Sequence, residues 1–77
     1  MSGKRIINNI RKTLKEFDDG DIVDITDIGC AMKRLDGKIR WSRCEIAGAM
    51  TKVTDIFIPT GEKNGLNLKT YTVHHNV

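Results

Sequence analysis

The feature that most constrains the fold is a helix-start signal in the middle of the chain, at residues 41–53. Ser42 can accept a hydrogen bond from the first turn of a helix, and Glu45 can accept one from the Ser42 backbone N–H, which together make a capping box. Trp41 before the cap and Ile46 after it have the spacing of a hydrophobic staple, which fixes the angle at which the chain enters a helix. The sequence therefore predicts a helix whose first residue follows Ser42.

The same segment predicts an amphipathic helix that ends near Val53 or Thr54. Ile46, Met50 and Val53 recur at helical spacing, which places them on one face. The other face carries small or polar residues that would allow close approach by a partner: Cys44, Gly48, Thr51 and Lys52. Glycine inside a helix costs roughly 1 kcal/mol relative to alanine, so we expect a packing or contact reason for Gly48.

Length and composition predict a single domain over residues 1–77, with an ordered core at about residues 4–73. Of the 77 residues, 39% are hydrophobic and 30% are charged, a balance typical of globular domains rather than disordered chains. The apolar runs are too short for a membrane-spanning helix. Charges interrupt the N-terminal segment, which argues against a secretory signal. We expect a cytoplasmic protein with no membrane partner.

The net charge of +3 is unevenly distributed along the chain. Residues 1–27 carry five basic and six acidic side chains, whereas residues 28–77 carry eight basic and four acidic ones. Because the positive half contains the capped helix, its charge favours a polyanionic partner. The acidic group between Glu16 and Asp27 would instead suit a basic protein partner.

Two further helices and a short strand are predicted before the capped helix. Residues 4–17 place large apolar side chains at helical spacing: Ile6, Ile7, Ile10, Leu14 and Phe17. Residues 22–25 are β-prone and predict a strand. Thr26 or Asp27 can cap a second helix that ends near Leu35.

The C-terminal third predicts a β-hairpin. Residues 55–58 are β-prone and are ended by Pro59, and residues 66–73 supply the returning strand. Residues 60–65 are dense in turn-forming residues and would make the tip, with Asn64-Gly65 as a strong hairpin dipeptide. An alternative interpretation makes the capped helix the first half of a helix-turn-helix pair, followed directly by another helix. The proline argues against that alternative, because it would break such a helix.

The sequence contains no catalytic or metal-binding pattern. Cys30, Cys44, His74 and His75 lack zinc-ligand spacing, and neither a phosphate-binding loop nor a nucleophile elbow occurs. We expect Cys30 to be a small core residue and Cys44 to be a thiol on a helix surface, both reduced. The sequence therefore predicts a protein that is not an enzyme and that uses no metal or cofactor.

The order of elements, the Ser42-x-x-Glu45 box and the turn-rich tip at residues 60–65 together resemble a winged-helix domain, the helix-turn-helix variant in which a β-hairpin forms the wing. The resemblance covers residues 4–73 and rests on the order and size of the elements rather than on a diagnostic motif. It implies an α+β fold of three helices, with a short strand after the first helix and a C-terminal β-hairpin wing.

In winged-helix DNA-binding proteins the third helix usually enters the major groove and the wing touches the backbone or the minor groove. Carried over to this chain, the resemblance implies DNA contacts from the third helix and the wing: Arg43, Cys44, Gly48, Thr51, Lys52, Lys63, Asn64 and Lys69. Phosphates can also be neutralised by nearby basic residues: Lys33, Arg34, Lys38 and Arg40. The expected function is a small transcriptional regulator that contacts duplex DNA. The alternative is a protein-interaction module that docks into a larger assembly.

Overall fold

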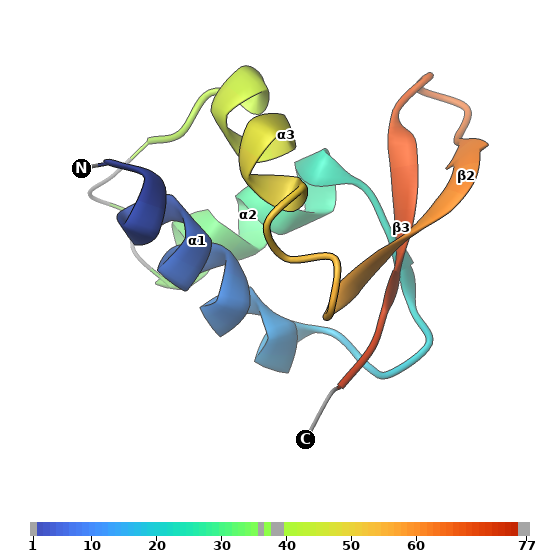
Figure 1. Ribbon diagram of the computed structural model, residues 1–77, viewed down its shortest axis with the longest axis horizontal. Helices are drawn as coiled ribbons and strands as arrows, with labels where there is room; N and C mark the ends of the chain where they lie inside the picture. The colour runs from blue at the N-terminus through green and yellow to red at the C-terminus, as the bar shows by residue number, and fades with distance from the viewer. Residues whose placement is uncertain (1, 36, 38–39, 76–77) are drawn as a thin grey trace.

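The α-helices lie together on one side of the molecule and a small antiparallel sheet lies on the other (Figure 1). The computed structural model describes residues 2–35, 37 and 40–75, so Lys38, an expected phosphate contact, lies outside the described residues. Within these ranges the elements are α1 (Ser2–Lys12), the 3-10 helix η1 (Thr13–Glu16), β1 (Ile22–Val23), α2 (Ile25–Leu35), α3 (Arg43–Met50), β2 (Phe57–Lys63) and β3 (Lys69–Val73). The predicted α+β composition, the short strand after the first helix and the C-terminal hairpin are confirmed. No helix in the described ranges is both long enough and apolar enough to cross a membrane.

The helices and the sheet share one hydrophobic core. Ile6 and Ile10 of α1 are buried as the apolar pattern predicts, and the remaining apolar side chains of that stripe pack at the edge of the core. Phe57, at the start of β2, is fully buried and meets the ring of Phe17 edge to face, with ring centroids 6.2 Å apart. Full burial of a side chain such as Phe57 contributes about 1.5–3 kcal/mol to stability.

The second helix begins earlier than the sequence analysis predicted. The cap is Asp24, not Thr26 or Asp27, and α2 starts at Ile25. The Asp27 backbone N–H donates to Asp24 Oδ1 at 3.0 Å, and the Asp24 N–H donates to Asp27 Oδ2 at 3.1 Å. This reciprocal pair has the geometry of a capping box with aspartate in both positions. This cap starts α2 within the segment predicted to be a strand, so the strand covers only residues 22–23.

The hairpin also departs from the prediction, because β2 begins at Phe57 and continues to Lys63, β3 begins only at Lys69, and the tip lies later. The turn spans residues 64–68 rather than 60–65: the Asn64 N–H donates to the Leu68 carbonyl and the Asn67 N–H donates to the Asn64 carbonyl. Asn67 takes the left-handed conformation, with φ of 61°. This is the geometry of a three-residue hairpin loop, in which the Asn64-Gly65 pair is not the centre of a two-residue turn.

The strand order β1-β3-β2 explains how Pro59 fits within a strand instead of ending one. β2 is an edge strand, so a residue without a backbone N–H can face solvent there without breaking the sheet. The presence of β2 also removes the alternative interpretation of a further helix directly after α3.

α3 ends at Met50, shorter than the predicted end at Val53 or Thr54. Beyond it the backbone forms tighter turns of the 3-10 type, because the N–H groups of Lys52 and Val53 donate to carbonyls three residues back. Cys30 also differs from expectation: it is exposed on α2 and not buried in the core. The apolar face of α2 is supplied instead by Ile28, Ala31 and Met32.

One ion pair ties α1 to the turn before β2. The Arg11 guanidinium donates to both carboxylate oxygens of Asp55, at 3.1 Å and 3.4 Å. This hydrogen-bonded guanidinium lowers the pKa of the Asp55 carboxyl below its ordinary value. Arg11 is therefore engaged within the protein.

The hairpin is tied to α2 through the same aspartate that caps the helix. Asp24 is only 6% exposed, and its second carboxylate oxygen accepts a hydrogen bond of 2.5 Å from the Asn64 side-chain amide. The amide oxygen of Asn64 in turn accepts from the backbone N–H groups of Leu66 and Leu68. Asp24 and Asn64 thus hold the helix start and the hairpin turn together.

We expect the substitution Asp24→Ala to lower the free energy of unfolding by about 1–3 kcal/mol, because it removes both a helix cap and the partner of Asn64. Asp27→Ala is the matched control, since it removes only the hydrogen bond from the Asp24 backbone N–H to the Asp27 carboxylate. Urea denaturation followed by circular dichroism measures both variants. Equal effects of the two substitutions would contradict the link between the helix and the hairpin.

Candidate nucleic-acid interface

The capping box predicted for the third helix is present and orients α3. The Glu45 N–H donates to Ser42 Oγ at 3.1 Å, and the Ser42 N–H donates to the Glu45 carboxylate at 3.0 Å. The helix buries Ile46, Ala49 and Met50 against the core. The Glu45 carboxylate, which would otherwise add negative charge beside a DNA-contacting face, is engaged in the cap.

The exposed face of α3 is built from small side chains. Cys44, Gly48 and Thr51 are exposed as the sequence predicted, and Ala47 extends the same surface. The Thr51 hydroxyl donates to the Gly48 carbonyl at 2.8 Å, so its hydrogen is used within the helix. A methyl group added at Gly48 would meet no heavy atom within 4 Å, so packing inside the molecule gives no reason for this glycine. The face can be approached closely by a partner.

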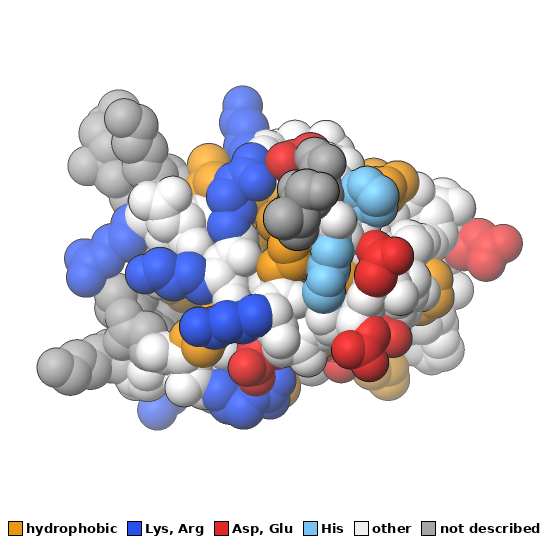
Figure 2. Space-filling view, turned by 90° about the horizontal axis from the view of Figure 1, so that it is seen from below, with side chains coloured by type: hydrophobic (Ala, Val, Ile, Leu, Met, Phe, Trp, Pro, Cys, Tyr) orange, Lys and Arg blue, Asp and Glu red, His pale blue; other side chains and the backbone are white. Residues whose placement is uncertain are grey.

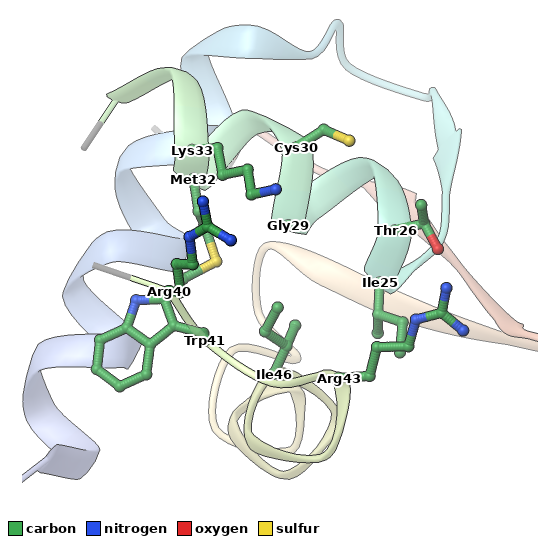
Figure 3. A pocket seen from close by; sticks show the side chains of 10 residues that line it. All are labelled: Ile25, Thr26, Gly29, Cys30, Met32, Lys33, Arg40, Trp41, Arg43 and Ile46. Atoms are coloured by element: carbon green, nitrogen blue, oxygen red, sulfur yellow. The ribbon is translucent and has the colours of Figure 1, made fainter. Parts of the chain in front are cut away.

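A cavity of about 340 Å³ opens between α2 and α3 (Figure 3). Its apolar wall includes Ile25, Met32 and Ile46, and Figure 3 shows the Ile46 side chain pointing from α3 into the space. Three basic residues line the same cavity: Lys33, Arg40 and Arg43. No acidic residue is among the described residues that line it. Arg40 and Arg43, both predicted to contact DNA, thus line the same cavity as Lys33, and Figure 3 shows Arg43 at the other end of it from Lys33 and Arg40.

The hairpin presents two lysines directly opposite each other. Lys63 on β2 and Lys69 on β3 are cross-strand partners. Lys69 alternates with Tyr71 and Val73, which are buried, so it lies on the face of the sheet that covers the core. Glu62 lies on the same surface, but no ion pair joins it to either lysine. Directly opposed like charges destabilise a sheet, and an anion bound between them would relieve that cost.

The remaining predicted contacts are distributed differently. The side-chain amide of Asn64 is occupied by Asp24 and by the turn backbone, so Asn64 shapes the hairpin tip. Lys52 lies beside a separate cavity between α1 and α3, with Ile7 and Trp41, and not with the Arg40 and Arg43 group. Arg34 donates to the Glu16 carboxylate at 2.9 Å and is engaged on the far side of α2.

Among the ion pairs between described residues, none involves Lys33, Arg40, Arg43, Lys63 or Lys69. The hairpin tip and the N-terminal end of α3 lie at the same end of the molecule, away from the C-terminus (Figure 1). Arg43, the first residue of α3, and the paired Lys63 and Lys69 beside the hairpin turn belong to these segments, whereas Lys33 and Arg40 lie at the other end of the cavity from Arg43 (Figure 3). The sequence analysis named each of these basic residues, but its predicted DNA contacts did not include Thr26, which lines the cavity, or Ala47, which is exposed on α3.

The opposite end of the molecule carries charges of both signs in separate regions (Figure 2). Lysines and arginines gather toward the left of that view, and acidic side chains gather toward the right. Lys12 and Lys15, near the end of the first helical segment, line this surface with His75. The exposed acidic turn contributes Asp18, Asp19 and Asp21.

No protein-family model, curated protein or solved structure matches the chain. Within the part of the chain that the structure describes, no group of three or more histidine, cysteine or acidic side chains is placed to hold a metal ion. The geometry of the interface is therefore the basis for assigning a function.

We expect Gly48→Ala to raise the free energy of unfolding by about 0.5–1 kcal/mol, because alanine favours the helix and the added methyl meets open space. Thermal denaturation of the two proteins checks this. Ala47→Gly is the matched control on the same face and should destabilise by a similar amount. Destabilisation by Gly48→Ala would show that the glycine has a packing role within the molecule.

We expect Lys63→Gln to stabilise the isolated protein by about 0.2–1 kcal/mol at low salt, because it removes the charge opposite Lys69. Added salt should reduce the gain, since it screens exposed charges. Urea denaturation at low and high salt measures the difference. Lys52→Gln is the control, since Lys52 has no cross-strand partner. A loss of stability in Lys63→Gln at low salt would contradict repulsion between the two lysines.

Proposed function

We propose that this protein is a winged-helix DNA-binding domain that contacts duplex DNA through α3 and the β2–β3 hairpin, as a small transcriptional regulator. The observation that carries the proposal is the presence of two groups of basic residues, Lys33, Arg40 and Arg43 about the cavity beside α3, and Lys63 opposite Lys69 on the hairpin. Like charges assembled by separate elements raise the energy of the free protein, and a polyanion relieves it.

The surface between the two basic groups supports contact with a duplex. The exposed face of α3 is small, so the helix can lie close to base edges while flanking side chains meet phosphates. Arg43 at the start of α3 can contact a phosphate or a guanine edge. The predicted face has few other side chains suited to reading bases, so backbone contact supplies most of the affinity.

The element order supports the winged-helix assignment. A strand joins the first two helices, the third helix precedes the hairpin, and all three strands form one antiparallel sheet. In this arrangement α3 takes the place of the recognition helix and the β2–β3 hairpin takes the place of the wing. The bond between Asp24 and Asn64 would hold the wing at a set position relative to the helices.

A second candidate function, docking onto a protein, is favoured by the outer face of the sheet. Ile22 and Ile58 are cross-strand neighbours of the same residue, Thr72, and are 59% and 42% exposed. Exposed apolar side chains on either side of Thr72 suit a protein contact. The acidic turn at residues 18–21 borders the same sheet and would favour a basic partner.

We expect the protein to bind a labelled random duplex, with an affinity that falls steeply between about 50 and about 200 mM salt. The double variant Arg40→Gln, Arg43→Gln should weaken binding by about tenfold or more and lower the log–log salt slope by about 1.8, because two phosphate contacts are lost. Fluorescence anisotropy measures the affinity and the slope.

The double variant Lys12→Gln, Lys15→Gln is the matched control, because it removes the same charge from a separate surface, beside His75. It should leave the affinity nearly unchanged. Equal weakening by the two double variants would mean that net charge alone drives binding. Greater weakening by the control would move the contact surface to α1. Absence of binding at low salt would overturn the DNA proposal and favour docking onto a protein.

A further inference from the structure

The cavity between α2 and α3 combines an apolar interior with a basic rim. A DNA phosphate would contact the basic rim but not the apolar interior. A phosphate needs positive charge and hydrogen-bond donors but has no apolar part to cover Ile25, Met32 and Ile46. Apolar walls with a few convergent polar groups, and a volume of about 340 Å³, are the features of small-molecule sites.

Gly29 keeps the interior of this cavity open. A methyl group added there would lie 3.4 Å from the Ile46 terminal methyl carbon, so any larger side chain would compete with Ile46 for the space. α2 and α3 can therefore enclose a space at this point while their neighbouring residues, Ile28 and Ala49, remain in the core.

The polar groups of the cavity all suit an anion. Lys33, Arg40 and Arg43 provide positive charge, and a guanidinium matches a carboxylate with two parallel hydrogen bonds. The Thr26 hydroxyl is shielded from solvent and has no hydrogen-bond partner among the described residues. Figure 3 shows it at the same end of the cavity as the Arg43 guanidinium. A carboxylate bound beside Arg43 would offer this hydroxyl an acceptor.

We infer that the cavity between α2 and α3 is a binding site for a small amphipathic anion, a carboxylate with an apolar tail. The tail lies against Ile25, Met32 and Ile46, and the carboxylate lies at the rim beside Arg43. The site goes beyond the proposed function, because binding of the anion requires no DNA. It also bears on that function, since an occupied site would neutralise Arg43 and so compete with DNA.

The test is a titration of the full chain with octanoate in the absence of DNA. Trp41, the single tryptophan, lines the cavity, so its fluorescence should change and saturate. Three probes separate the contributions: acetate has the charge without the tail, octanol has the tail without the charge, and octylammonium reverses the charge. We expect octanoate to bind at least about tenfold more tightly than octanol, with acetate and octylammonium weaker still.

Amide shifts in NMR spectra locate the binding, since Trp41 also borders the cavity between α1 and α3. Octanoate should shift the amide signals of Gly29 and Arg43 and leave those of Ile7 and Gly48 unchanged. Arg43→Gln should weaken octanoate binding by about threefold to tenfold, while Lys12→Gln, the matched control, should not. Equal affinity for octanoate and octanol, shifts centred on Ile7 and Gly48, or no saturable binding would each overturn the inference.

The outcome is independent of the DNA experiment, because the protein can bind octanoate whether or not it binds a duplex. If both bind, octanoate should release labelled duplex at concentrations that saturate the cavity, and acetate at equal ionic strength should not. Simultaneous binding without competition would overturn the shared use of Arg43 and leave the anion site standing.

Discussion

The buried carboxylate of Asp24 is the interaction on which the arrangement of this protein depends. One oxygen caps α2 and the other accepts from Asn64 at the turn of the hairpin, 40 residues away in the chain. A carboxylate this far from solvent is costly unless its oxygens are satisfied by hydrogen bonds, and here both are. Because Asn64 also organises its own turn, the start of the second helix and the tip of the hairpin are positioned together.

Tertiary packing gathers basic residues from different parts of the chain into two groups. Lys33, Arg40 and Arg43 surround a cavity between two helices, and Lys63 and Lys69 oppose each other across the hairpin. The pairing of the two lysines does not favour folding, since directly opposed like charges destabilise a sheet. By contrast, Arg11 and Arg34 form ion pairs elsewhere on the molecule. These two groups of like charge are the physical basis for proposing anionic partners, both a duplex and a small carboxylate.

The sequence predicted those elements whose signals are local. The apolar stripe of α1 and the capping box of α3 both depend on residues within a few positions of one another, and both are present. The predictions that were wrong concern positions where several residues could have played the same structural role. Asp24, rather than Thr26 or Asp27, caps α2, and its carboxylate also accepts a hydrogen bond from Asn64. The hairpin tip lies later than predicted because the Asn64 side chain closes the turn at residues 64–68. Cys30 was expected in the core, but Ile28, Ala31 and Met32 already fill that face.

By itself, the sequence determined the helices, the existence of a hairpin and the small exposed face of α3, because periodicity and capping act through neighbouring residues. It also identified the basic residues of the candidate interface, though not their grouping. Only the tertiary structure decided that Arg40 and Arg43 share a cavity with Lys33 while Lys52 lies beside another, and that Asn64 is engaged by Asp24. The reason is physical: which side chains converge depends on how α2 and α3 pack and on the register of β2 and β3, and these follow from contacts between residues far apart in the chain.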